Sequence, residues 1–251
     1  MDVNLHSWKY FYDFVRQEML DYAHYIWRGQ RDSQWSLVSS IDRQLRNKDL
    51  TNEGKASEHL SKFKLSTRGR RGTNPAKIDD ENEWWALGQH HGLATPLLDW
   101  TASPFVALYF AFDKPTRPNS GSRSVWALTG NVDEKNKKLV AESHKSQTLL
   151  TAGPAPILDL IRPTQDENAR LVAQAGLFTK APLGETVDEW VRKNYCGETS
   201  GAVIIKFVIP ELGRTECLRT LNKMNINHLT LFLDIYGASL QCNKALEIDK
   251  Y

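Results

Sequence analysis

Residues 89–112 read Gln-His-His-Gly-Leu-Ala-Thr-Pro-Leu-Leu-Asp-Trp-Thr-Ala-Ser-Pro-Phe-Val-Ala-Leu-Tyr-Phe-Ala-Phe. Leu97 to Trp100 predicts a short strand, and Ser103 and Pro104 suit the N-cap and first position of a helix. From Phe105 to Phe112 the residues are apolar on every helical face, which is typical of a helix buried in the centre of a domain. The stretch therefore predicts a strand that leads directly into a central helix.

The flanking sequence predicts short elements of both kinds. A helix is expected over 79–89, followed by Gly92 at a position where glycine adopts positive φ without steric cost. Tyr25 to Gln30 predicts a strand. An amphipathic helix is expected over 7–20, and residues 66–80 are small, polar and basic, as in a loop. Further helices are expected over 51–65, 211–224 and 235–246, a helix or turn over 168–174, and strands over 124–128, 157–161, 176–179 and 202–209.

Helices and strands alternate without the regular spacing of βαβ units, which argues against a doubly wound fold. We therefore predict one α+β domain over residues 1–251, with core elements between 22 and 240. Its sheet is expected to be mixed and largely antiparallel, flanked by helices.

Composition and charge narrow the class of protein. The chain has 251 residues, 41% apolar and 25% charged, with a net charge of +2, so no strong overall field favours nucleic acid or an anionic membrane. The three cysteines, Cys196, Cys217 and Cys242, form neither a disulfide framework nor a CxxC pair. With no signal peptide and no apolar run near the roughly 20 residues that span a bilayer, we expect a cytoplasmic protein without membrane contact. His90 and His91 are adjacent rather than four apart, so no metal is expected.

Two segments carry side chains suited to binding. Arg28 stands near the end of a strand beside Gly29, where backbone and guanidinium can both approach a phosphate or carboxylate. A buried ion pair or a loop clamp would explain it equally well. Asp99 lies in an apolar run and needs a partner, for which Arg28 is a candidate. Thr101 and Ser103 precede a helix N-terminus that attracts anions, although Ser103 also suits simple capping.

The predicted loop over 66–80 contains a basic run, Arg68-Gly69-Arg70-Arg71. A solvated surface loop is one interpretation, and contact with phosphate or nucleic acid is the other.

These segments resemble a known family. Trp27-Arg28-Gly29 is similar to the Phe-Arg-Gly motif that names the FRG domain. The stretch quoted above resembles the second hallmark of that family, Gln-His-aromatic-Gly-Leu-Pro-Thr-Arg-Leu-Leu-Asp-Trp-Thr-x-Ser-Pro followed by Ala-Leu-Tyr-Phe-Ala. It departs at His91, Ala94 and Pro96, and the last removes a cation that the family often has.

Two later elements extend the resemblance to residue 237. The family element Asn-x-Arg-Ile-x-x-Gln-x-Gly-x-Phe is met as Asn168, Arg170, Leu171, Gln174, Gly176 and Phe178. Residues 232–237 resemble Phe-Pro-Asp-Leu-x-Gly. Because the family occurs largely in bacteria and their mobile elements, the resemblance implies a role as a toxin or in phage defence.

A shorter resemblance points to ADP-ribosyltransferases. These enzymes share an Arg on a first strand, a Ser-Thr-Ser strand that runs into an Ala-x-x-Phe-Ala helix, and a late Gln-x-Glu or Glu-x-Glu. Arg28 and Thr101-Ala102-Ser103 are similar to the first two motifs, whereas Gln174-Ala175-Gly176 has Gly where the catalytic Glu stands. The resemblance implies an ADP-ribosyltransferase-like fold and an NAD-consuming transferase or glycohydrolase.

On that hypothesis, Arg28 grips the pyrophosphate of NAD, and Thr101 and Ser103 orient the ligand. Asp99 supplies the missing negative charge, Gln174 bonds a hydroxyl or acceptor, and His90 serves as acid or base unless it is simply an interior histidine. The expected NAD contacts are Trp27, Arg28, Gly29, Gln30, Gln89, Thr95, Trp100, Arg170 and Phe178.

Two alternatives remain open. The chain could be a binding module without catalysis, with a nucleotide at Arg28 and nucleic acid at Arg68 to Arg71. It could also be a metal-independent nuclease-like toxin that uses His90, Asp99 and Arg28. The acceptor could be nucleic acid or protein, and the sequence leaves the oligomeric state undetermined.

Overall fold

The described strands form one seven-stranded sheet. A computed structural model describes residues 1–46, 53–130, 132–146, 155–163, 169–196 and 202–251. Its sheet has the strand order β1-β7-β4-β2-β3-β6-β5, in which β1 and β7 are parallel and the other pairs are antiparallel. The strands are β1 (Asp2–Asn4), β2 (Tyr25–Gln30), β3 (Leu97–Thr101), β4 (Ser122–Thr129), β5 (Asp159–Ile161), β6 (Gly176–Lys180) and β7 (Ile204–Pro210). The prediction of an α+β domain with a mixed, largely antiparallel sheet is confirmed.

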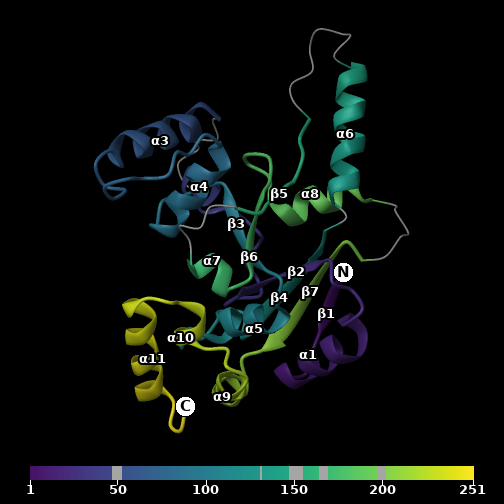
Figure 1. Cartoon of the computed structure of the whole chain (residues 1–251). Coiled ribbons are helices and arrows are strands. Elements are labelled where there is room, and N and C mark those ends of the chain that lie inside the picture. Colours follow the sequence, from purple (N-terminus) through teal and green to yellow (C-terminus); the bar gives the residue numbers. More distant parts are fainter. Residues whose placement is uncertain (47–52, 131, 147–154, 164–168, 197–201) are drawn as a thin grey trace.

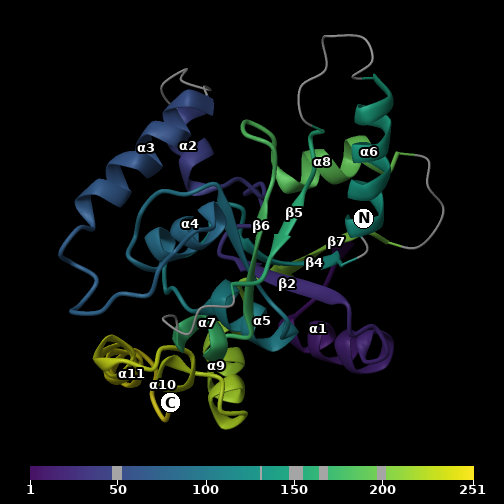
Figure 2. The ribbon, with the colours of Figure 1, turned by 45° about the horizontal axis from the view of Figure 1, so that its top comes forward.

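Helices cover both faces of this sheet. In Figures 1 and 2, α1, α5 and α9 lie on one side and α6 and α8 on the other. The helices are α1 (Trp8–Phe14), which continues as a π-helical turn over Val15–Met19, α2 (Ser40–Arg46), α3 (Glu53–Ser66), α4 (Glu81–His90), α5 (Pro104–Phe112), α6 (Val132–Ser146), α7 (Ala169–Ala173), α8 (Val187–Asn194), α9 (Arg214–Lys223), α10 (His228–Leu231) and α11 (Ile235–Glu247). No helix among the described residues has the length and apolar character needed to cross a bilayer.

The side chains of each strand alternate between two hydrophobic cores, one on each face of the sheet. On β2, Trp27 packs in the cluster that contains α1, α5 and α9, whereas its neighbour Ile26 packs in the cluster with α8. On β4, Val125 and Trp126 divide in the same way. Successive strand side chains point to opposite faces, so each strand contributes to both cores.

Helix α5 is the central element, as its sequence predicts. Ser103 accepts a hydrogen bond from the main chain of Val106, which caps the helix, and Pro104 follows at the first position. The helix lies so close to β2 that a Cβ on Gly29 would sit 1.9 Å from the main-chain oxygen of Ala107. The glycine in Trp27-Arg28-Gly29 is therefore required for packing of helix on strand.

The C-terminal end of α5 is surrounded by cations. Arg214 Nε donates to the main-chain oxygen of Phe112 at 2.7 Å, and Lys244 Nζ donates to that of Asp113 at 2.6 Å. Arg123, which is fully buried, donates to the main-chain oxygens of Ala111 and Lys114 and to the Glu211 carboxylate. These donors satisfy carbonyls that a helix end leaves free and carry the charge that its dipole favours.

Most predicted elements are present, including the loop over 67–80 and the positive φ of Gly92, which is 86°. The elements β1, α6, α8 and α10 were not predicted. Strand β1 has three residues and is held by main-chain pairing with β7, which leaves no local pattern. Helix α8 does carry a local signal, because Thr186 and Glu189 form a capping box at its start.

Candidate functional site

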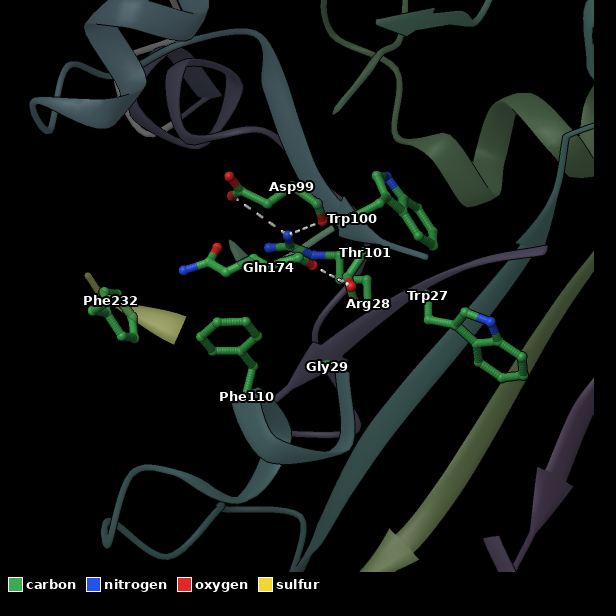
Figure 3. A pocket seen from close by; sticks show the side chains of 9 residues that line it. All are labelled: Trp27, Arg28, Gly29, Asp99, Trp100, Thr101, Phe110, Gln174 and Phe232. Carbon is green, nitrogen blue, oxygen red and sulfur yellow. Dashed lines mark hydrogen bonds and ion pairs between the residues drawn. The ribbon is translucent and has the colours of Figure 1, made fainter. Parts of the chain in front are cut away.

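A cavity of about 310 Å³ lies where β2 and β3 separate. The two strands pair only at Trp27 and Thr101 among the described residues, and the cavity opens beside that pair. Helix α5, the segment before β6 and the segment after α10 complete its wall, as Figure 3 shows. The lining residues are Trp27, Arg28, Gly29, Asp99, Trp100, Thr101, Phe110, Gln174 and Phe232.

Arg28 connects the two strands at the cavity. Its Nη1 atom donates to the main-chain oxygen of Asp99 at 2.6 Å and lies 3.7 Å from Asp99 Oδ2. Burial lowers the pKa of Arg28, and the nearby Asp99 carboxylate opposes that change. The Nε atom is buried and has no hydrogen-bond partner among the described residues. The guanidinium therefore keeps donors that its contacts with Asp99 do not use.

Asp99 is oriented by a chain of side chains. Gln89 Nε2 donates to Asp99 Oδ1 at 2.7 Å, and the amide oxygen of Gln89 accepts a hydrogen bond from Thr95, which is fully buried. The Asp99 side chain is 65% exposed, so it is less buried than its apolar neighbours suggest. Gln89 and Thr95 thus act on the cavity through Asp99, although they are absent from its lining.

Thr101 joins β3 to the start of α5 and to Gln174. Its Oγ1 atom donates to the main-chain oxygen of Gln174 at 2.6 Å and accepts a hydrogen bond from the main chain of Ser103 at 3.1 Å. The Gln174 side chain donates to the main-chain oxygen of Leu231 at 3.0 Å. Ser103 is absent from the cavity lining and caps the helix instead.

Two aromatic rings that the sequence analysis did not assign to the site form one wall. Phe110 and Phe232 meet edge to face, with ring centroids 6.2 Å apart. The Arg170 guanidinium lies 5.3 Å from the Phe232 centroid and pairs with Asp234, so Arg170 supports this wall from outside. Residues 232–237 do match an FRG element, which is the signal that could have identified Phe232.

Several predicted contacts face the core. Figure 3 shows the indole rings of Trp27 and Trp100 turned away from the cavity. Trp27 stacks on Phe207, and Trp100 Nε1 donates to Thr179 Oγ1 at 2.8 Å. Both rings therefore belong to the core, although the two residues line the cavity.

Gln30, Phe178 and His90 lie outside the lining as well. Gln30 bonds the main chain of Ser36 and the Trp126 indole, and Phe178 is a core residue of β6. His90 packs edge to face against His91 with centroids 4.9 Å apart. The structure thus brings Arg28, Asp99, Thr101 and Gln174 together, but not His90.

Gly176 is the residue that the sequence resemblance sets against the glutamate of ADP-ribosyltransferases. It pairs with Thr101 across β3 and β6, and a Cβ there would lie 2.6 Å from Leu171 Cδ1. Among the described residues that line the cavity, Asp99 is the one acid. Within the described lining, the candidate carboxylate for chemistry is therefore Asp99 on β3. The neighbouring Asn168 of the FRG-like element lies outside the described residues.

The fold and the cavity define an α+β protein with an arginine-lined cavity between two separating strands. Residues 23–120 match the family model of the FRG domain, so the chain carries an FRG domain. The search of curated proteins and the search of solved structures gave no match. The match covers Arg28, Asp99 and helix α5, whereas Gln174 and Phe232 lie beyond it.

Proposed function

We propose that the cavity binds NAD and cleaves the bond between nicotinamide and ribose, passing ADP-ribose to water or to an acceptor. The observation that carries this proposal is the meeting of Arg28 with Asp99, Thr101 and Gln174 around one cavity. Arg28, Thr101 and Gln174 come from the three segments that resemble ADP-ribosyltransferase motifs. The strands that carry or follow those segments, β2, β3 and β6, are neighbours in the sheet.

The residues present fit the phosphates of a dinucleotide. Arg28 lines the cavity with donors that its contacts with Asp99 do not use, and a guanidinium binds phosphate through paired donors. The rings of Phe110 and Phe232 supply an apolar wall for a flat base or nicotinamide. The volume of about 310 Å³ lies at the low end for ligand pockets, so it suits part of the dinucleotide with the remainder outside.

Asp99 is the residue we assign to the chemical step. When the C1′–N bond breaks, its electron pair leaves with neutral nicotinamide and positive charge develops on the ribose. The Asp99 carboxylate stabilises that charge, as carboxylates do in glycoside hydrolysis. The oxygen of water or of an acceptor hydroxyl then bonds to C1′ and its proton passes to solvent. We assign the Gln174 amide, in the wall of the same cavity, to bond a ribose hydroxyl.

A second candidate is nucleotide binding without catalysis. The observation that favours it is Gly176, because the glutamate of the related motif is absent. A nuclease-like reaction has less support, since His90 is absent from the cavity lining. The FRG resemblance suggests a toxin or phage-defence role, and NAD depletion would suit either. Nucleic acid and protein both remain candidate acceptors.

The test measures nicotinamide release and ligand binding on the same protein. NAD labelled in the nicotinamide ring is incubated with wild type and with Asp99→Asn, with and without DNA, RNA or protein acceptors, while calorimetry measures NAD and ADP-ribose affinity. The proposal expects release by wild type and its loss in the variant. Binding of both ligands without release by wild type would establish the second candidate, and absence of binding would reject both.

A further inference from the structure

A second cavity of about 670 Å³ lies between the end of α3 and the end of α4. One part of its wall is apolar and consists of Phe63 and Leu87. The other part carries hydroxyls and positive charge. It consists of Ser66, Thr67, Arg70, Arg71 and His91.

One segment of the chain beside this cavity carries charge of one sign. Residues 59–78 contain six lysines and arginines and no aspartate or glutamate. Lys62 and Lys77 pair with acids just outside this segment, Glu58 and Asp79, at 2.7 and 2.9 Å. The other cations of this segment are Lys64, Arg68, Arg70 and Arg71. Arg68 and Arg70 have no acidic partner among the described residues.

Two of these cations lie close to the ring of Trp84. Lys64 Nζ lies 5.6 Å and Arg71 Cζ 5.1 Å from the centroid of its ring. Arg71 also donates to the main-chain oxygen of Ala76 at 2.7 Å, which ties the loop back on itself. Two cations thus lie beside one ring, where a polyanion would interact favourably with both.

We propose that this basic cavity binds single-stranded nucleic acid. Regularly spaced phosphates match several cations along one segment, and the wall of Phe63 and Leu87 admits an unstacked base. A duplex keeps its bases paired and stacked, so it would use the charges but not the apolar wall. An acidic peptide likewise supplies charge without a base. The binding does not depend on the NAD chemistry proposed for the first cavity.

The test is fluorescence anisotropy with labelled single-stranded RNA and DNA and with a duplex of the same sequence, over a range of salt. Arg68→Ala with Arg70→Ala removes two unpaired cations. The matched control is Lys137→Ala with Lys138→Ala, which removes two exposed cations from α6. We expect the first pair to weaken single-strand binding roughly tenfold and to reduce the salt slope by about 0.7 for each lost contact. The control should match wild type.

Further variants separate a folding defect from a binding defect. Arg68→Lys with Arg70→Lys keeps the charge and should restore most of the affinity, and Asp99→Asn should bind oligonucleotides as wild type does, whatever its effect on NAD. Equal binding by wild type and the double alanine variant would overturn the proposal. So would duplex affinity equal to that of the single strand, or equal competition by polyglutamate and by unlabelled oligonucleotide.

Discussion

Arg28 is held by the main chain of Asp99 as well as by its carboxylate. Nη1 is 2.6 Å from the carbonyl oxygen and 3.7 Å from Oδ2. The shorter contact persists whichever side chain stands at position 99. The position of the guanidinium is therefore separable from the charge of the acid, and the two roles assigned to them can be tested independently.

Asp99→Asn should abolish cleavage without abolishing binding. We expect nicotinamide release to fall by at least about 100-fold, the size typical of a lost electrostatic contact to a transition state. ADP-ribose affinity should change little, because the main-chain oxygen still holds Arg28. Single-turnover assays and calorimetry measure the two quantities. An equal fall in both would contradict this division of roles.

Arg28→Lys should weaken ligand binding although it keeps the positive charge. An ammonium cannot reproduce the planar fork, so at least one charge-assisted hydrogen bond is lost, worth about 1.5–3 kcal/mol. Calorimetry with ADP-ribose should show roughly a tenfold or greater rise in Kd. Arg68→Lys, far from this lining, serves as the control and should bind as wild type does. Unchanged affinity in Arg28→Lys would exclude bidentate phosphate binding.

Gly29→Ala should destabilise the fold. The new Cβ would meet the backbone of α5 at Ala107 and Ala111, which flexible side chains cannot relieve. We expect a loss at or above the upper end of the 1–3 kcal/mol that overpacking usually costs. Urea unfolding measures it. At Gly130 the nearest atom to such a Cβ is 3.1 Å away, so Gly130→Ala should cost clearly less, and equal losses would refute the packing explanation.

Asp113 should make stability depend on acid. Burial raises the pKa of this carboxyl, but the hydrogen bond from His228 and the charges of Lys244, His228 and Lys114 outweigh burial and hold it well below the ordinary 3.8. A carboxyl whose pKa is lower in the folded than in the unfolded protein stabilises the fold fully at pH values above its unfolded pKa. That contribution is lost as the pH falls through its folded pKa.

Asp113→Asn should therefore flatten the fall of unfolding free energy below about pH 4, the upper limit of that window. Urea unfolding between pH 2 and 5 measures the slope, which separates this effect from any overall loss of stability. Asp21→Asn, at an exposed turn, should keep the wild-type slope. A wild-type slope in Asp113→Asn would show that this carboxyl does not control acid unfolding.

Local sequence signals were sufficient for α5, for the strand that carries Arg28, and for its pairing with Asp99. Each depended on a cap, a run of apolar residues or a charge that needed a partner. The indoles of Trp27 and Trp100 were assigned to the ligand too readily. Neighbours on a strand point to opposite faces. Alternation therefore predicts that the Trp27 ring points away from Arg28 and the Trp100 ring away from Asp99. Phe232 reaches the wall only after the chain folds back past α9, which no local pattern specifies.

The cations around the end of α5 have a consequence for synthesis. Lys244 and its acceptor carbonyl at Asp113 are 131 residues apart. At usual translation rates that interval takes on the order of ten seconds. Helix α5, an almost wholly apolar helix, leaves the ribosome within this interval. Lys244 has not yet been synthesised at that point. The family-matched segment ends at residue 120, so it is a unit of sequence similarity that completes its contacts only after residue 244 has been synthesised.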